Sequence, residues 1–97
     1  MNKHLVDKLR PGKLKGSQPI DDASVKAFGQ AVRKLRLERG VSQEDLAAIA
    51  GIERAHMGRI ERGEKTPTLR LILKIASAFE ISSAIIMTEM EKILREK

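Results

Sequence analysis

Residues 42–63 read SQEDLAAIAGIERAHMGRIERG, and this stretch predicts two short helices joined by a glycine turn. Ser42 is a helix-capping residue, and the acidic residues after it favour the positive end of a helix. Gly51 stops the first helix, because glycine accepts the left-handed backbone that follows a helix end. We expect helices over 43–50 and 54–62, the second ended by Gly63. Helices this short are marginal alone, so both must pack on neighbouring segments.

Apolar residues at helical spacing predict three further helices, over 24–39, 68–79 and 82–96. Aromatic residues make up only 2% of the chain, so the core must be aliphatic. The residues expected to face inward are Val25, Phe28, Val32, Leu35, Leu46, Ala47, Ile49, Ala50, Met57, Ile60, Leu69, Ile72, Leu73, Ala76 and Phe79. The pattern predicts an all-α, five-helix domain over residues 23–97, preceded by a basic arm over residues 1–22.

Composition narrows the classes of function. The net charge of +6 indicates a polyanionic partner, either nucleic acid or an anionic surface. The chain has no cysteine, which excludes disulfides and thiolate metal sites and fits a reducing cytosol. His4 and His56 have no further ligand nearby in sequence, so we expect no metal site and no cofactor. No catalytic motif and no apolar run of about 18 residues is present, so we expect neither an enzyme nor a membrane protein.

The second helix of the pair has a cationic side. At about 100° per residue, one arc of about 140° holds Arg54, Ala55, Gly58, Arg59 and Arg62. Arginines with very small residues between them suit the major groove of DNA, because the backbone can approach closely and the guanidinium can fork onto guanine. A glycine inside a helix costs roughly 1 kcal/mol relative to alanine, so Gly58 either marks a close approach or is simply tolerated.

Residues 43–62 resemble the helix-turn-helix of the Xre/Cro family of phage-repressor-like regulators, and the likeness extends from about Val25 to Leu94. The family's order is also followed by Phe28-Gly29, Leu35-Arg36, Ile60-Glu61-Arg62-Gly63, Pro67-Thr68-Leu69, Leu73-Lys74-Ile75-Ala76 and Ile81-Ser82. The resemblance implies a lambda-repressor-like fold and a non-enzymatic transcriptional regulator that binds double-stranded DNA. The chain is also similar to the small controller regulators of restriction-modification systems.

The resemblance implies roles for individual residues. Bases are expected to be read by Arg54, Ala55 and Arg59. Phosphates are expected at Gln43 and, more weakly, at His56, Arg62, Lys65, Thr66 and Thr68. Arg36 and Glu61 match a family ion pair that joins the first helix to the third. Two positions depart from the family, since Glu53 replaces the usual cap of the reading helix and Glu80 replaces the usual glycine after the fourth helix.

The last helix carries more apolar residues than one core contact requires. We expect a homodimer interface formed by Ile85, Ile86, Met87, Met90, Ile93 and Leu94. A two-fold dimer would place two reading helices about 34 Å apart on a pseudo-palindromic operator.

Several alternatives stay open at this point. The basic arm either wraps DNA or is a disordered tail that aids solubility. The chain is either a free regulator, an antitoxin that also binds a toxin protein, or a protein-interaction adaptor that kept the fold. A regulator of this kind is expected in the cytoplasm, at the nucleoid.

Overall fold

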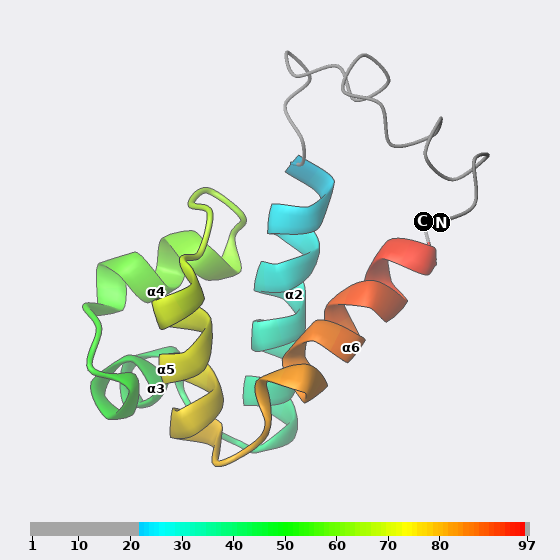
Figure 1. Cartoon of the computed structure of the whole chain (residues 1–97). Helices are drawn as coiled ribbons and strands as arrows, with labels where there is room; N and C mark the ends of the chain where they lie inside the picture. Colours follow the sequence, from blue (N-terminus) through cyan, green and yellow to red (C-terminus); the bar gives the residue numbers. More distant parts are fainter. Residues whose placement is uncertain (1–21, 97) are drawn as a thin grey trace, which may run out of the picture.

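The computed structural model describes residues 22–96, which form five α-helices and, within that range, no β-strand (Figure 1). The helices are α2 (Asp22–Glu38), α3 (Gln43–Ala50), α4 (Arg54–Glu61), α5 (Leu69–Phe79) and α6 (Ser83–Arg95). The predicted all-α, five-helix fold is confirmed. The first helix begins at Asp22, two residues before the range expected for it, and the rest of the expected arm lies outside the described residues.

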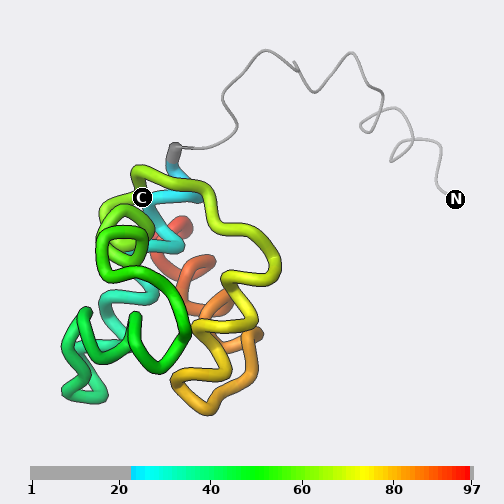
Figure 2. Tube along the Cα trace, turned by 90° about the vertical axis from the view of Figure 1, so that its left-hand side faces the viewer, coloured from blue at the N-terminus to red at the C-terminus, as the bar shows by residue number. Residues whose placement is uncertain are grey.

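The five helices share one core, and α2 is the helix on which α4 and α6 pack. Both α6 and α4 pack against α2, while α3 packs between α4 and α5 (Figure 1). Seen from the left of that view, α3 and α4 lie toward the viewer, with α2 and α6 behind them (Figure 2). The helix-turn-helix pair therefore forms one side of the molecule, and α4 has one face against α2 and another open.

The core is aliphatic, as the composition predicts. Its completely buried large side chains are Val32, Leu46, Met57, Ile60, Ile75 and Ile86. Three inward assignments were wrong, because Ile49, Leu69 and Leu73 are 64%, 73% and 51% exposed. At about 100° per residue, Leu69 and Leu73 lie more than 100° around α5 from the line through Leu71 and Ile75, so they point away from the core.

A glycine sets the close crossing of α2 and α4. A Cβ atom on Gly29 would overlap the carbonyl oxygen of Ile60 and lie 2.5 Å from that of Glu61. Only a residue without a side chain lets the two backbones approach this closely. The end of α4 is therefore held directly on the central helix, which fixes the direction of its outward face.

Within the described range, no single helix is both long and apolar enough to cross a membrane; only α5 and α6 taken together, bent by 107°, meet those two criteria.

Candidate nucleic-acid interface

Local capping defines the turn between α3 and α4. The Ser42 hydroxyl accepts a hydrogen bond from the backbone N–H of Asp45 at 3.0 Å, which starts α3. Gly51 adopts φ 74°, and the N–H of Ile52 then donates to the carbonyl of Ala47 at 3.0 Å. Glu53 caps α4 by backbone conformation alone, since its side chain makes no capping hydrogen bond. The short turn thus fixes the angle at which α4 leaves α3.

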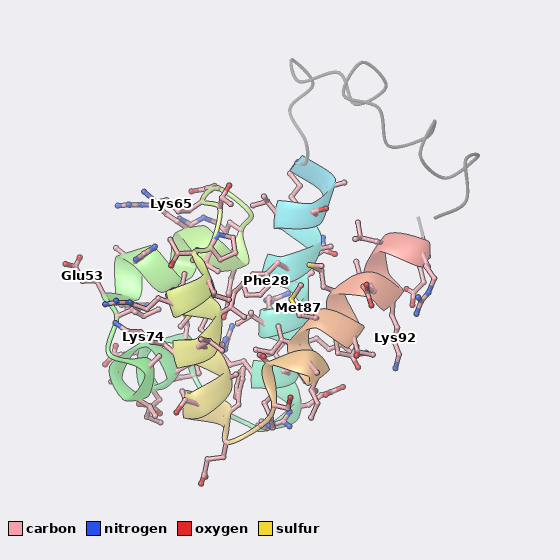
Figure 3. The ribbon with its side chains drawn as sticks, in the orientation of Figure 1. Phe28, Glu53, Lys65, Lys74, Met87 and Lys92 are labelled. Carbon is pink, nitrogen blue, oxygen red and sulfur yellow. The ribbon has the colours of Figure 1, made fainter. Side chains whose placement is uncertain are left out.

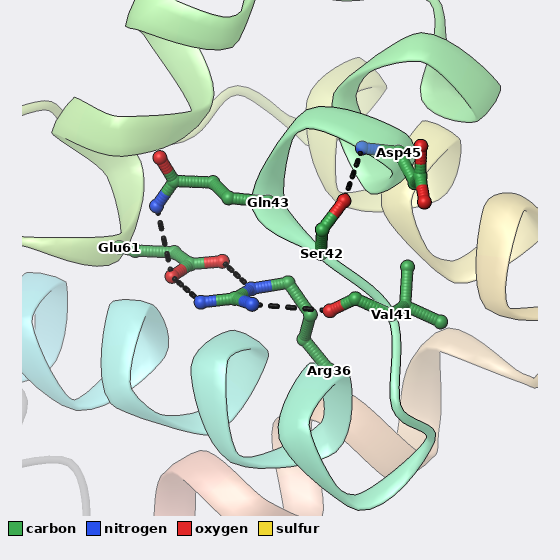
Figure 4. A network of polar contacts seen from close by, with 6 residues as sticks. All are labelled: Arg36, Val41, Ser42, Gln43, Asp45 and Glu61. Atoms are coloured by element: carbon green, nitrogen blue, oxygen red, sulfur yellow. Dashed lines mark hydrogen bonds and ion pairs between the residues drawn. The ribbon is translucent and has the colours of Figure 1, made fainter.

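A buried ion pair joins α2 to the end of α4 (Figure 4). Nε of Arg36 donates to Oε2 of Glu61 at 2.7 Å, and Nη2 donates to Oε1 at 3.0 Å. Nη1 donates to the carbonyl of Val41 at 3.0 Å, in the loop before α3. Hydrogen bonding to Glu61 raises the pKa of Arg36, so the guanidinium stays charged. The pair expected from the family pattern thus ties the central helix to the end of α4 and to the loop that leads into α3.

Gln43 extends this network to the surface. Its Nε2 donates to Oε1 of Glu61 at 3.1 Å, so the first turn of α3 is linked to the last turn of α4 (Figure 4). The donors that remain for the expected phosphate contact at Gln43 are its second amide hydrogen and the free backbone N–H groups of the first turn.

The outward face of α4 is concave. A hollow of about 450 Å³ is lined by Gln43, Arg54, Ala55, Gly58, Arg59 and Arg62. Arg54, Ala55 and Arg59 are exposed, whereas Met57 and Ile60 on the opposite side are completely buried. Neither Arg54 nor Arg59 forms an ion pair with another residue of 22–96. The expected base-reading residues therefore lie together on one accessible surface.

A second, cationic hollow of about 400 Å³ lies between the start of α4 and α5. Its lining includes Arg59, Lys65, Arg70, Lys74, His56 and a single carboxylate, Glu53. None of the four lysines and arginines is ion-paired within the described chain. Lys65, Lys74 and Glu53 project on one side of the molecule, while Phe28 and Met87 point into the interior (Figure 3). The hollow therefore has an unbalanced positive charge beside α4.

Two residues of this hollow, Arg70 and Lys74, were not among the expected site residues. They are one turn apart on α5, so they share a face of that helix. The signal that could have found them is this spacing, combined with the recognition that Leu69 and Leu73 leave the core. Because Leu69 and Leu73 were assigned to the core, α5 was predicted to have only a structural role.

Of the remaining phosphate candidates, two line the cationic hollow, one lies at the concave face and Thr66 lies at neither. Thr68 lines the cationic hollow, and its hydroxyl accepts from the N–H of Leu71 at 3.1 Å to cap α5. His56 is half-buried at the same hollow, and Thr66 is exposed in the loop before α5. Arg62 lies instead at the concave face, where its guanidinium is paired with Glu64.

The expected interface on α6 is partly wrong. Ile86 is completely buried in the core of the same chain, so it has no surface to offer a second copy. Met87, Met90 and Ile93 are partly buried against that core, and Leu94 is half-buried. Ile85 is the member of the set that is substantially exposed, at 42%. Most of these apolar side chains therefore pack α6 against the core instead of forming a free surface.

Among the described residues, no group of three histidine, aspartate or glutamate side chains could hold a metal ion.

Comparison with known proteins identifies the family to which the chain is similar. A family model described as Helix-turn-helix matches residues 32–86. An uncharacterized HTH-type transcriptional regulator of Sinorhizobium fredii, y4dJ, is 28% identical over 67 residues, which are 69% of this chain and 87% of the relative. The control protein C.SmaI of Serratia marcescens is 37% identical over 61 residues, covering 63% of this chain and 73% of the relative. The crystal structure of the restriction-modification controller protein C.AhdI from Aeromonas hydrophila superposes with a TM-score of 0.65 at 41% identity, over 66% of this chain and 97% of that one.

Proposed function

Because the chain belongs to the helix-turn-helix family, of Xre/Cro type, and is a DNA-binding transcriptional regulator, we propose that it binds a pseudo-palindromic operator as a homodimer, with α4 in the major groove. The observation that carries the proposal is the concave outward face of α4, where Arg54 and Arg59 are exposed and form no ion pair with any residue of 22–96. We place this activity at the nucleoid, in the cytoplasm.

Arg54 and Arg59 are the proposed base readers. Each presents a fork of N–H donors that matches O6 and N7 of guanine, the commonest specific contact in the major groove. Ala55 lies between them and is small enough to let the helix approach the bases or to contact a thymine methyl group. The buried Arg36–Glu61 pair and the Gly29 crossing hold α4 rigidly, so the arginines are presented from a fixed helix.

The DNA backbone is proposed to run past α4 on both sides. On one side, the start of α3 offers Gln43 and free backbone N–H groups to a phosphate. On the other, the cationic hollow offers Lys65, Arg70 and Lys74, together with the half-buried His56. Lysines and arginines that bind phosphates displace condensed counterions, so this part of the binding free energy falls steeply with salt.

The proposed dimer uses apolar side chains that the monomer leaves exposed on α5 and α6. Leu69 and Leu73 lie one turn apart on the outer face of α5, and Ile85 lies on α6, the next helix along the chain. A shallow apolar depression on α5 is lined in part by the two leucines. A two-fold pairing of this surface would bury it and give two copies of α4 for two half-sites.

The decisive experiment is selection of bound sequences from a pool of random DNA duplexes. Wild-type protein is expected to enrich paired half-sites that contain guanine. Replacing Arg54 and Arg59 together with alanine should weaken binding to the selected duplex by at least tenfold, since each good arginine–guanine contact contributes about 1–3 kcal/mol of discrimination. Binding is measured by fluorescence anisotropy at fixed salt.

The matched control is the double variant Arg33→Ala with Arg95→Ala, which removes the same charge from exposed positions on α2 and α6. It should leave selectivity unchanged. If the Arg54/Arg59 variant bound the selected duplex as wild type does, the base-reading role would be rejected. An adaptor would show no duplex preference at all, and an antitoxin would additionally co-purify with a toxin protein.

A further inference from the structure

Arg62 occupies an unusual position on the reading surface. It follows the last residue of α4, on the same side of the helix axis as Arg54 and Gly58. Side chains on a helix lean toward its N-terminus, so Arg62 runs back over the preceding turn. Its Nη1 lies 3.0 Å from the place where a Cβ atom on Gly58 would stand. The guanidinium therefore lies over the middle of the outward face.

Gly58 provides the space for this placement. Gly58 is buried although it points outward, because Arg62 and Gln43 cover it. Oε1 of Gln43 lies 3.4 Å from the same hypothetical Cβ position. The glycine inside α4 is thus explained by two side chains of the protein itself that lie flat across it.

Glu64 holds the guanidinium by one edge. Nε of Arg62 donates to Oε2 of Glu64 at 2.8 Å, and Nη2 donates to Oε1 at 3.2 Å. Hydrogen bonding from Arg62 lowers the pKa of Glu64, which keeps the carboxylate ionised. The two side chains are 59% and 52% exposed, so the pair adds little to stability. Its effect is to orient the guanidinium.

We propose that Glu64 positions Arg62 as a third base-reading side chain, directed at a guanine in the major groove. The carboxylate occupies the Nε edge. One N–H on each of Nη1 and Nη2, at the end of the guanidinium, is left without a hydrogen-bond partner among residues 22–96. That pair of donors matches O6 and N7 of guanine. The inference rests on the proposed operator binding and revises the expected phosphate role of Arg62.

A phosphate contact is the weaker assignment for Arg62. Glu64 cancels the charge of the guanidinium, so the attraction to a phosphate is reduced, and the carboxylate itself repels the DNA backbone. Directional hydrogen bonds to a base edge do not depend on net charge in the same way. A paired arginine therefore retains its ability to select a base while losing much of its non-specific attraction.

The test compares the sequence preferences of variants selected from one pool of random duplexes. Wild type is expected to enrich guanine at a position that Arg62→Ala no longer selects, with at least a fivefold loss of discrimination there. The positions read by Arg54 and Arg59 should persist. Arg62→Lys keeps the charge but cannot fork, so it should lose the same preference. Gly58→Ala should weaken that preference too, because the new methyl group displaces the guanidinium.

Glu64→Gln tests the positioning role directly. It should reduce selectivity at the Arg62 position without lowering affinity for a scrambled duplex. Glu91→Gln is its control, because it makes the same change of charge at an exposed site on α6. Circular dichroism checks that each variant keeps its helices.

Two results would overturn the inference alone. Arg62→Ala could weaken binding to all duplexes equally and flatten the log–log salt dependence by about 0.9, which is the signature of a phosphate contact. Glu64→Gln could instead strengthen binding with an unchanged motif, and Glu64 would then be a competitor of DNA for Arg62. A wild-type protein that enriches no motif would overturn both this inference and the proposed function.

Discussion

Glu61 is the residue on which the site depends most. Its two oxygens accept three hydrogen bonds, two from Arg36 and one from Gln43. The side chain is almost completely buried, so no water replaces these donors readily. It connects the central helix α2, the start of α3 and the end of α4 at a single point.

Removing this carboxylate should be strongly destabilising. Glu61→Ala leaves the charge of Arg36 buried without a partner, and breaking such a pair on one side typically costs about 3–5 kcal/mol. The free energy of unfolding is measured by urea denaturation followed by circular dichroism. The exposed Glu38→Ala on α2 is the control and should change stability by less than about 0.5 kcal/mol.

A second substitution separates the lost ion pair from simple loss of packing. Arg36→Met in the Glu61→Ala background removes the unpaired charge, so part of the lost stability should return. A loss below about 1 kcal/mol for Glu61→Ala alone would contradict the assigned role of this residue.

At the level of single residues, contacts between sequence-distant positions were predictable only where the family pattern supplied them. Arg36 and Glu61 were assigned together by resemblance, whereas the link from Glu61 to Gln43 was not. The Arg62–Glu64 pair depends on the loop path after α4, which helical spacing does not describe. The reason for a glycine at position 58 inside α4 also depends on where the Arg62 side chain lies.

At the scale of helices, the ends were more predictable than the faces. Ser42 and Gly51 are start and stop signals that act locally, and each caps a helix as expected. Ser82 caps α6 in the same way, since its hydroxyl accepts a hydrogen bond from the N–H of Ala84. Inward faces were assigned by apolar character, which fails where an apolar residue lies at the wrong angle. Leu69 and Leu73 are the clearest cases, because Leu71 and Ile75 define the inward direction of α5.

The end of α5 stores strain at Glu80. This residue adopts φ 58°, the left-handed conformation in which the family usually has glycine. The conformation costs a residue with a side chain about 1–2 kcal/mol, part of which is offset by the greater unfolded-state freedom of glycine. Glu80→Gly is therefore expected to raise the free energy of unfolding by roughly 0.5–1 kcal/mol.

Thermal unfolding checks this prediction, since 1 kcal/mol corresponds to about 4–8 °C in a domain of this size. Glu80→Ala is the matched variant, because it removes the same carboxylate but keeps the Cβ atom. It should give no gain. Equal melting temperatures for the glycine and alanine variants would show that the backbone at this position is not strained.

At the scale of the whole molecule, the described chain divides into a side that is proposed to bind DNA and an apolar side. The concave face of α4 and the cationic hollow share Arg59, so they form one continuous surface. Leu69, Leu73 and Ile85 lie outside both hollows, on α5 and α6. Arg70 and Lys74 line both the cationic hollow and the apolar depression on α5, so the two surfaces meet along that helix. A dimer through the apolar side would leave the concave face of α4 available in each copy, with Arg70 and Lys74 at the edge of the pairing surface.

Charged substitutions on the apolar side should therefore yield monomers that remain folded. Leu69→Glu with Leu73→Glu places two carboxylates where the second copy would pack, and neither leucine contributes to the core, so stability should fall little. Sedimentation equilibrium is expected to show half the wild-type mass. Binding to a paired half-site should lose cooperativity, because each half-site is then filled independently.

Control variants distinguish a dimer that pairs through α5 from one that pairs through α6. Leu37→Glu is the control, since Leu37 is an exposed leucine on α2 that does not line the apolar depression on α5. Ile86→Glu is unsuitable, because a carboxylate in the core would unfold the monomer and imitate a lost interface. If the α5 variant sediments as wild type does and Ile85→Glu alone produces monomers, the pairing surface lies on α6. A wild-type protein that is monomeric at micromolar concentration and fills the half-sites independently would remove the dimer from the proposed mechanism, leaving α4 to read a single half-site.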